Sequence, residues 1–279
     1  MILIADSGAT KTEWRTITTD GQIGQARTVG ISPYYQTDEA IAAELRQNLL
    51  PALSGTVTEI HYYGTGCSGP EPIATVERAL RAVFPEADKV RVGSDLLGAA
   101  RALCGKEPGI ACILGTGSHA CLYDGHDIAQ PAVSLGFWLG DEGSGGYLGK
   151  TLMVHYLRGE LPADLAEKFS RRYNSPDRLT VLDHAYKQPY PNRYFASFSK
   201  FLFDNRSHPF AYQLVYEAFG LFVDKYVRTF PGHQNLPVHF VGSVAFYYSD
   251  ILRRVVSDKG LTPARILENP IAGLALYHQ

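Results

Sequence analysis

The sequence predicts an α/β protein built from two related lobes that face a central cleft. A short apolar segment that ends in a polar, glycine-bearing turn occurs twice: Met1–Ala5 runs into Asp6-Ser7-Gly8, and Ile110–Leu114 runs into Gly115-Thr116-Gly117-Ser118. Each turn is followed by another apolar strand and then by an Asp-Gly pair, which is a hairpin signal. We therefore expect an internal duplication of supersecondary structure rather than of residue identity.

The first lobe is predicted to alternate between strands and helices. Apolar runs bounded by turn residues predict strands at Met1–Ala5, Thr12–Thr18, Ile23–Thr28, Ile60–Tyr63 and Val90–Val92. Helix start and stop signals predict helices at Thr37–Leu50, Pro72–Phe84 and Asp95–Leu103. Asp38 and Glu39 favour the positive end of the first of these helices, and Pro51 follows its end.

The second lobe repeats the strand pattern and then becomes mostly helical. Strands are predicted at Ile110–Leu114, His119–Tyr123 and Val238–Val241, and helices at Glu142–Leu157, Ala163–Tyr173, Asn192–Phe203, Phe210–Phe230 and Ile271–His278. Gly105, Pro108 and Gly109 cluster between the lobes. We expect residues 1–108 to form the N-terminal domain, with the helix near 270–279 packing back on it. Residues 109–269 then form the C-terminal domain, with a helical insertion.

Composition excludes several classes of protein. Of the 279 residues, 45% are hydrophobic and 19% are charged, as in ordinary globular chains. The formal net charge of -2 gives no electrostatic reason to expect nucleic acid or an acidic membrane as partner. The first residues lack the basic start of a signal peptide, and no apolar run approaches the ~20 residues that a membrane helix needs.

The cysteines point to a reducing compartment. Their positions form no CxxC pair, which disfavours a zinc or redox motif: they are Cys67, Cys104, Cys112 and Cys121. Scattered cysteines in a chain without a signal peptide are typical of reduced thiols, so we expect a cytoplasmic protein.

The turn after the first strand is a candidate phosphate and magnesium site. Glycine allows backbone N–H groups to turn toward an anion, and neighbouring hydroxyls add donors. A carboxylate at the end of a strand, here Asp6, can hold magnesium directly or through water. An ordinary hairpin turn explains the segment equally well when it is taken alone, and it lacks the P-loop pattern.

The turn at Thr116 and Gly117 is the second candidate for binding phosphate. It too could be a plain hairpin. Because both turns end apolar strands and recur some hundred residues apart, we expect them to clamp a triphosphate between the lobes.

Two acidic positions are candidates for catalysis and substrate binding. Asp95 lies between a predicted strand and helix, where it could cap the helix or take a proton from a substrate hydroxyl during phosphoryl transfer. Asp141 lies in the glycine-dense segment Gly140–Gly146, which would allow a ligand to approach closely. The structural alternative is that Asp141 caps the following helix, with Glu142 in its first turn.

A strand-to-helix turn at Gly242 and Ser243 completes the set. Helix N-termini that follow such turns favour phosphate or the edge of a nucleotide, although this signal alone is weak.

In this order, the five segments resemble the actin-like ATPase superfamily, which includes hexokinases and acetate kinases. DSGATKT and LGTGS resemble its two phosphate motifs, and VGSV resembles its adenosine motif. Ser94-Asp95 with Gly98-Ala99, together with LGDEGSG, resembles the N-acetylglucosamine kinase branch, which is related to the BadF/BadG/BcrA/BcrD ATPase family. The resemblance spans nearly the whole chain and implies two ribonuclease H-like domains facing the cleft.

The resemblance also implies an activity and its residues. It implies an ATP- and Mg²⁺-dependent kinase that phosphorylates a hydroxyl of N-acetylglucosamine or a related amino sugar. We also expect a homodimer. Asp95 would be the catalytic base, and Asp6 would serve the metal. ATP and phosphate would be held by Ser7, Gly8, Thr10, Lys11, Thr12, Thr116, Gly117, Gly242 and Ser243. The sugar would be held by Ser68, Asp95, Thr116, Gly117 and Asp141.

Two departures from the family pattern concern the sugar. Ser32 and His119 stand where asparagine is common in the family. They bear on the identity of the sugar rather than on the phosphoryl chemistry.

Two alternative functions are a BadF/BcrA-type ATPase that activates a partner enzyme and a sensor that no longer turns over nucleotide. The absence of a close cysteine pair disfavours the first, because that branch holds an iron–sulfur cluster with cysteines. The intact Asp6, Asp95 and phosphate turns disfavour the second.

Overall fold

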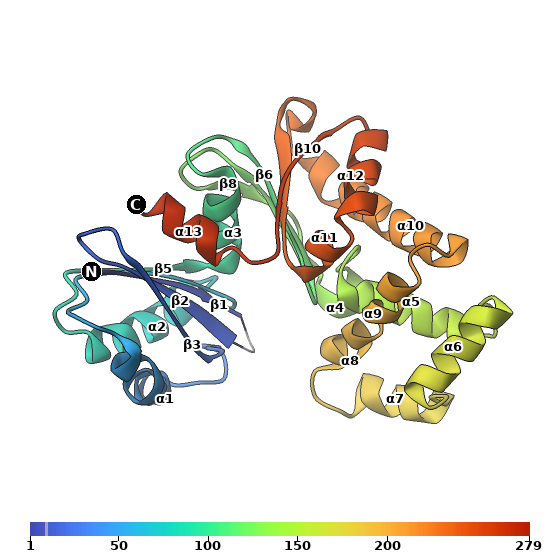
Figure 1. The fold of residues 1–279 in the computed structure, drawn as a ribbon, viewed down its shortest axis with the longest axis horizontal. Helices are drawn as coiled ribbons and strands as arrows, with labels where there is room; N and C mark the ends of the chain where they lie inside the picture. Colours follow the sequence, from blue (N-terminus) through green and yellow to red (C-terminus); the bar gives the residue numbers. More distant parts are fainter. Residues whose placement is uncertain (9–10) are drawn as a thin grey trace. The chain divides into compact units, whose positions relative to one another are not determined.

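The computed structural model describes residues 1–8 and 11–279, which divide into two compact units (Figure 1). Unit 1 comprises Met1–Pro108, Tyr123–Ile128 and Asn269–Gln279. Unit 2 comprises Gly109–Leu122 and Ala129–Glu268. The chain therefore returns to unit 1 twice after first leaving it.

Unit 1 is built on sheet A, a mixed sheet of five strands in the order β3-β2-β1-β4-β5. Its strands are β1 (Ile2–Ser7), β2 (Lys11–Ile17), β3 (Ile23–Val29), β4 (Glu59–Gly64) and β5 (Lys89–Ser94). The antiparallel pairs β1–β2 and β2–β3 form the predicted meander, whereas β4 runs parallel to both β1 and β5.

Both faces of sheet A are covered by helices. Because side chains alternate along a strand, Leu3 and Ala5 of β1 enter one core and Ile4 enters the other. The first core is covered by α1 (Asp38–Glu44) and α2 (Pro70–Val83), and the second by α3 (Asp95–Cys104) and α13 (Ile271–Tyr277) (Figure 1).

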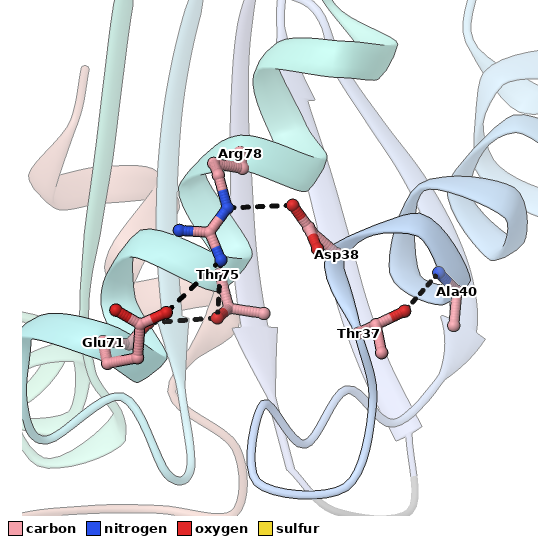
Figure 2. A network of polar contacts seen from close by, with 6 residues as sticks. All are labelled: Thr37, Asp38, Ala40, Glu71, Thr75 and Arg78. Atoms are coloured by element: carbon pink, nitrogen blue, oxygen red, sulfur yellow. Dashed lines mark hydrogen bonds and ion pairs between the residues drawn. The ribbon is translucent and has the colours of Figure 1, made fainter.

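A polar network links α1 to α2 at the surface of unit 1 (Figure 2). Arg78 Nε donates to Asp38 Oδ2 at 2.8 Å, and its Nη2 donates to Glu71 and Thr75. Thr37 caps α1 by accepting from Ala40 N. The helix that was predicted to run to Leu50 ends at Glu44 and continues as a π-helical turn, Leu45–Leu49.

Sheet B of unit 2 repeats the topology of sheet A. Its strand order, β10-β9-β6-β7-β8, equals that of sheet A once β6 is matched to β1. The strands are β6 (Gly109–Leu114), β7 (Ser118–Tyr123), β8 (Ile128–Pro131), β9 (Pro237–Val241) and β10 (Thr262–Leu267). The parallel pairs β6–β9 and β9–β10 correspond to β1–β4 and β4–β5. The predicted duplication of supersecondary structure is therefore confirmed.

Helices make up the rest of unit 2. In chain order they are α4 (Gly136–Leu139), α5 (Gly145–Leu157), α6 (Ala163–Tyr173), α7 (Arg178–Tyr186), α8 (Pro191–Ser197), α9 (Ser199–Asp204), α10 (Pro209–Lys225), α11 (Ser243–Tyr247) and α12 (Ser249–Asp258). Their apolar faces join one core with the inward residues of sheet B, such as Ile110, Cys112 and Phe240. We did not predict β8, β10, α4, α7 and α12.

Three predicted helix boundaries in unit 2 were wrong. The helix expected from Glu142 begins at Gly145, because the Ser144 side chain caps it by accepting from Tyr147 N. Asn192–Phe203 is two helices, because 3₁₀-type hydrogen bonds on both sides of Phe198 interrupt the α-helical pattern. The helix expected to reach Phe230 ends at Lys225 and is followed by a 3₁₀ turn.

A close helix crossing in unit 2 gives the first testable prediction. A Cβ on Gly149 of α5 would lie 1.8 Å from the carbonyl oxygen of Phe195 in α8, so Gly149→Ala must force the helices apart. We expect this variant to lose about 1–3 kcal/mol or more of unfolding free energy, measured by denaturant titration.

Gly220→Ala is the matched control, because a Cβ there meets only the Lys259 side chain, at 3.7 Å. It should gain up to ~1 kcal/mol from helix propensity. Equal stability of the two variants would contradict the close crossing.

Candidate functional site

The carboxyl ends of three parallel strands are level in unit 1. Ser7 at the end of β1 pairs in register with Gly64 at the end of β4, and Gly64 pairs with Ser94 at the end of β5. Asp6 precedes Ser7, and Asp95 follows Ser94 as the first residue of α3. The register therefore places both predicted acidic residues at one edge of sheet A.

The two carboxyl groups at this edge influence each other. Burial, the negative charge of Asp95 and that of Glu13 together raise the pKa of Asp6 to about 7, against a smaller opposing effect of Lys11. Two acids sharing one region of low polarity resist being charged together. A bound cation would relieve this repulsion.

Asp95 does not cap α3, which was its structural alternative. Ser94 caps α3 by accepting from Leu97 N at 3.2 Å. Asp95 Oδ1 accepts from Leu96 N at 2.8 Å, a bond that orients the carboxylate at the start of the helix.

The side chains of the first turn mostly bond within unit 1. The hydroxyl oxygens of Ser7 and Thr12 lie 2.7 Å apart, and Thr12 also donates to Val29 O. Lys11 is paired with Glu13 at 2.9 Å. Gly8 is exposed, and its N–H donates to Lys11 O. Thr10, which we also predicted to bind phosphate, lies outside the described residues.

Ser68 is exposed in the loop that joins β4 to α2. Its neighbour Cys67 is buried, and burial together with the charge of Asp95 raises the pKa of the Cys67 thiol to about 12. The loop that carries Ser68 therefore lies within electrostatic range of Asp95.

In unit 2, the β6–β7 turn is held by direct backbone contacts. Gly145 N donates to Gly115 O at 2.8 Å, and Gly146 N donates to Thr116 O at 3.0 Å. A Cβ on Gly242 would lie 2.3 Å from Leu114 O. Glycine is needed at Gly242 for this contact and for its φ of +120°.

Asp141 is buried against the same turn. Its Oδ1 accepts from Ser118 N at 3.3 Å, and a Cβ on Gly117 would lie 2.9 Å from its Oδ2. Burial raises the pKa of Asp141, as does the charge of Glu142, while the Ser118 hydrogen bond opposes them. Ser144 rather than Asp141 caps α5, so the capping alternative was wrong, and Glu142 precedes the helix.

A cavity of about 420 Å³ opens beside the turn within unit 2. It is lined by Gly115, Thr116, Gly145, Ala196, Ser199, Lys200, Phe203, Asp204, Ser243, Val244, Tyr247 and Tyr248. The volume lies in the range of small-molecule sites, ~300–1,000 Å³, and the mix of aromatic, hydroxyl and charged groups suits a polar aromatic ligand.

The structure thus gathers the predicted residues into one set within each unit. Asp6, Ser7, Gly8, Lys11, Thr12, Ser68 and Asp95 belong to unit 1, and Thr116, Gly117, Asp141, Gly242 and Ser243 belong to unit 2. The aromatic and charged cavity residues, such as Phe203, Lys200 and Asp204, were not among the predicted site residues. Tyr247 could have been predicted from the sequence, because it lies on the short helix that starts at the Ser243 turn.

Within residues 1–8 and 11–279, no group of three or more His, Cys, Asp or Glu side chains could hold a metal ion by itself. In the same part of the chain, no helix is long and apolar enough to cross a membrane.

The pKa of Asp6 gives a second prediction. Between the unfolded value near ~4 and the folded value of about 7, the folded protein keeps a proton that the unfolded chain has lost. Stability contributed by this group therefore falls as pH rises through that window. Asp6→Asn should raise Tm over the wild type at about pH 8, and the gain should shrink toward about pH 5.

Asp88→Asn is the control for this measurement, because Asp88 is an exposed aspartate of the same unit. The raised pKa is contradicted when both variants show the same change in Tm at every pH.

Similar proteins were found only among solved structures. No protein-family model matches the chain, and no curated protein matches it in sequence. A protein of Porphyromonas gingivalis described as a "putative N-acetylglucosamine kinase" is 40% identical, with a TM-score of 0.93, and the match covers 100% of this chain and 98% of that chain.

More distant structures share the fold. A "putative N-acetylglucosamine kinase" of Chromobacterium violaceum is 20% identical over 100% of this chain and 98% of that chain, with a TM-score of 0.75. A "putative sugar kinase" of Cytophaga hutchinsonii is 17% identical over 100% of both chains, with a TM-score of 0.53. The full-length similarity to the P. gingivalis protein and the repeated sheet topology show that the chain belongs to the N-acetylglucosamine kinase-like family of the actin-like ATPase superfamily.

Proposed function

We propose that this protein is an ATP-dependent sugar kinase that phosphorylates a hydroxyl of N-acetylglucosamine or a related amino sugar. The observation that carries the proposal is the pair of acids, Asp6 and Asp95, at the carboxyl edge of sheet A. The 40% identity to the P. gingivalis protein supports a kinase of this class.

In this proposal Asp95 is the general base. It takes the proton from the acceptor hydroxyl as that oxygen attacks the γ-phosphorus of ATP, the bond between this phosphorus and the β–γ bridging oxygen breaks, and ADP leaves. The hydrogen bond from Leu96 N fixes its carboxylate, and the position at the start of α3 leaves it partly exposed to a substrate.

Asp6 is proposed to serve Mg²⁺. The residues fit this ion, because magnesium takes one or two carboxylates and completes its shell with water and phosphate oxygens. Burial and the nearby charge of Asp95 raise the pKa of Asp6, and a bound cation would offset both effects. When bound with ATP, the ion neutralises charge that develops on the phosphates.

The unit 2 cavity is proposed to hold the nucleotide. Thr116 and Gly117 would contact phosphate, and Gly242 and Ser243 the adenosine. Thr116 and Ser243 both line the cavity, and the aromatic rings of Phe203 and Tyr247 offer faces for a base. In unit 1, Ser7, Gly8, Lys11 and Thr12 would contribute to phosphate binding. The hydroxyls of Ser7 and Thr12 bond within unit 1, so these two residues would have to exchange those bonds to contact a phosphate.

The sugar is proposed to be bound by Ser68, Asp95, Thr116, Gly117 and Asp141. Carboxylates accept hydrogen bonds from ring hydroxyls, and the buried Asp141 is held in place by Ser118 N. All four cysteines are buried, which disfavours the alternative of an activating ATPase with a cysteine-held cluster.

We also propose a cytoplasmic location and a homodimer. The proposed domains are an N-terminal domain of residues 1–108 with 270–279, and a C-terminal domain of residues 109–269.

The base assignment gives a third prediction. Asp95→Asn should lower kcat by ~10²–10⁴, because loss of a general base typically costs that much, while ATP binding changes little. A coupled ADP-release assay measures turnover, and calorimetry measures nucleotide binding. Asp88→Asn is the exposed control and should behave as the wild type. Near-normal turnover by Asp95→Asn would exclude Asp95 as the base.

The acceptor gives a fourth prediction. A site that hydrogen-bonds a substrate group rejects analogues without it by up to ~10⁴–10⁵ in kcat/KM. We therefore expect kcat/KM to fall sharply from N-acetylglucosamine to glucose in a panel of free sugars, with the phosphorylated position assigned by NMR. An equal kcat/KM for glucose and N-acetylglucosamine would contradict the amino-sugar assignment but would not contradict the kinase assignment.

A further inference from the structure

A single buried tyrosine bonds two successive residues of the loop that carries Asp141. Tyr226 follows α10 directly and is 2% exposed. Its hydroxyl accepts from Asp141 N at 3.2 Å and donates to Glu142 Oε2 at 3.2 Å. One hydroxyl thereby satisfies a buried backbone donor and orients the acid next to it.

The backbone at Asp141 needs such support. Its φ of 58° is left-handed, a conformation that residues other than glycine rarely adopt and that persists only where surrounding contacts hold it. A second contact holds the side chain of this residue: Asp141 Oδ1 accepts a hydrogen bond from Ser118 N, where the β6–β7 turn ends. The unusual backbone therefore directs the carboxylate to the turn that carries Thr116 and Gly117.

The hydroxyl of Tyr226 is itself held in place. The tyrosine ring stacks on Phe222, with centroids 4.8 Å apart and planes inclined by 19°. The oxygen also lies 3.3 Å from where a Cβ on Gly140 would be, so the loop passes close over it. The ring therefore packs against a residue of α10, while its hydroxyl reaches the loop.

We propose that Tyr226 is a positioning residue for the acceptor sugar: it holds Asp141 in the left-handed conformation in which its carboxylate can meet the substrate. The inference rests on the proposed function, in which Asp141 binds the sugar. Tyr226 itself touches neither the sugar nor the nucleotide in this assignment.

Tyr226→Phe tests the assignment, because it removes only the hydroxyl and keeps the stacked ring. An unmet buried N–H typically costs enough to shift an equilibrium about tenfold or more. KM for N-acetylglucosamine should therefore rise about tenfold, while KM for ATP stays unchanged within error. Tyr156→Phe is the matched control, since it also deletes a hydrogen-bonded hydroxyl of unit 2, 3.0 Å from Ser170 Oγ. It should leave both KM values unchanged.

A double-mutant cycle separates positioning from general loss of structure. If Tyr226 acts through Asp141, Tyr226→Phe should raise the KM for the sugar much less in the Asp141→Asn background than in the wild-type background. An unchanged sugar KM in Tyr226→Phe overturns the assignment. So does an effect of the same size in both backgrounds.

Hydrogen exchange gives a readout that does not depend on activity. Amides of residues 140–143 should exchange about tenfold faster in Tyr226→Phe than in the wild type or in Tyr156→Phe. If the wild type phosphorylates no amino sugar, the proposed function fails, and the exchange comparison alone shows whether Tyr226 holds the loop. Equal exchange in all three proteins overturns the role of Tyr226.

Discussion

The parallel register of β1, β4 and β5 is the constraint on which the chemistry of unit 1 depends. Strands whose carboxyl ends are in register bring Asp6 and Asp95 to one edge, although the 88 residues from position 7 to position 94 separate them in the chain. Burial there disfavours the charged form of Asp6, and the negative charges of Asp95 and Glu13 add to this, so the pKa of Asp6 rises to about 7. A protein tolerates such a cost most readily where a ligand or ion removes it, because perturbed acids cluster at functional sites.

Unit 2 uses close backbone contact in place of paired charges. Gly145 and Gly146 donate directly to the β6–β7 turn, and Gly242 packs against the strand that leads into it. Side chains at these positions would push the three segments apart. Because these glycines lack Cβ atoms, three segments can line one cavity together: the β6–β7 turn, the start of α5 and the turn before α11.

The two sheets show how one topology can serve different tasks. In each, the first strand ends in a turn and two parallel strands lie on its other side. In unit 1 the edge carries acids, whereas in unit 2 it carries glycines, a buried Asp141 and a cavity. The full-length similarity to the P. gingivalis protein indicates that both halves of this arrangement belong to the family.

The sequence by itself determined the fold class, the duplicated meander, most strands, and the residues at the strand ends, Asp6, Asp95, Thr116 and Ser243. Those features arise from local periodicity and from turn residues next in sequence to the strands they end. The exact helix limits near Ser144 and Phe198, and the missed β10 and α12, depended on capping and packing that periodicity does not encode. Only the tertiary structure decided that Phe203 and Tyr247 line one cavity, and that Tyr226 bonds Asp141. These residues are joined by contacts between distant segments, and side-chain partners of that kind are set by how whole elements pack.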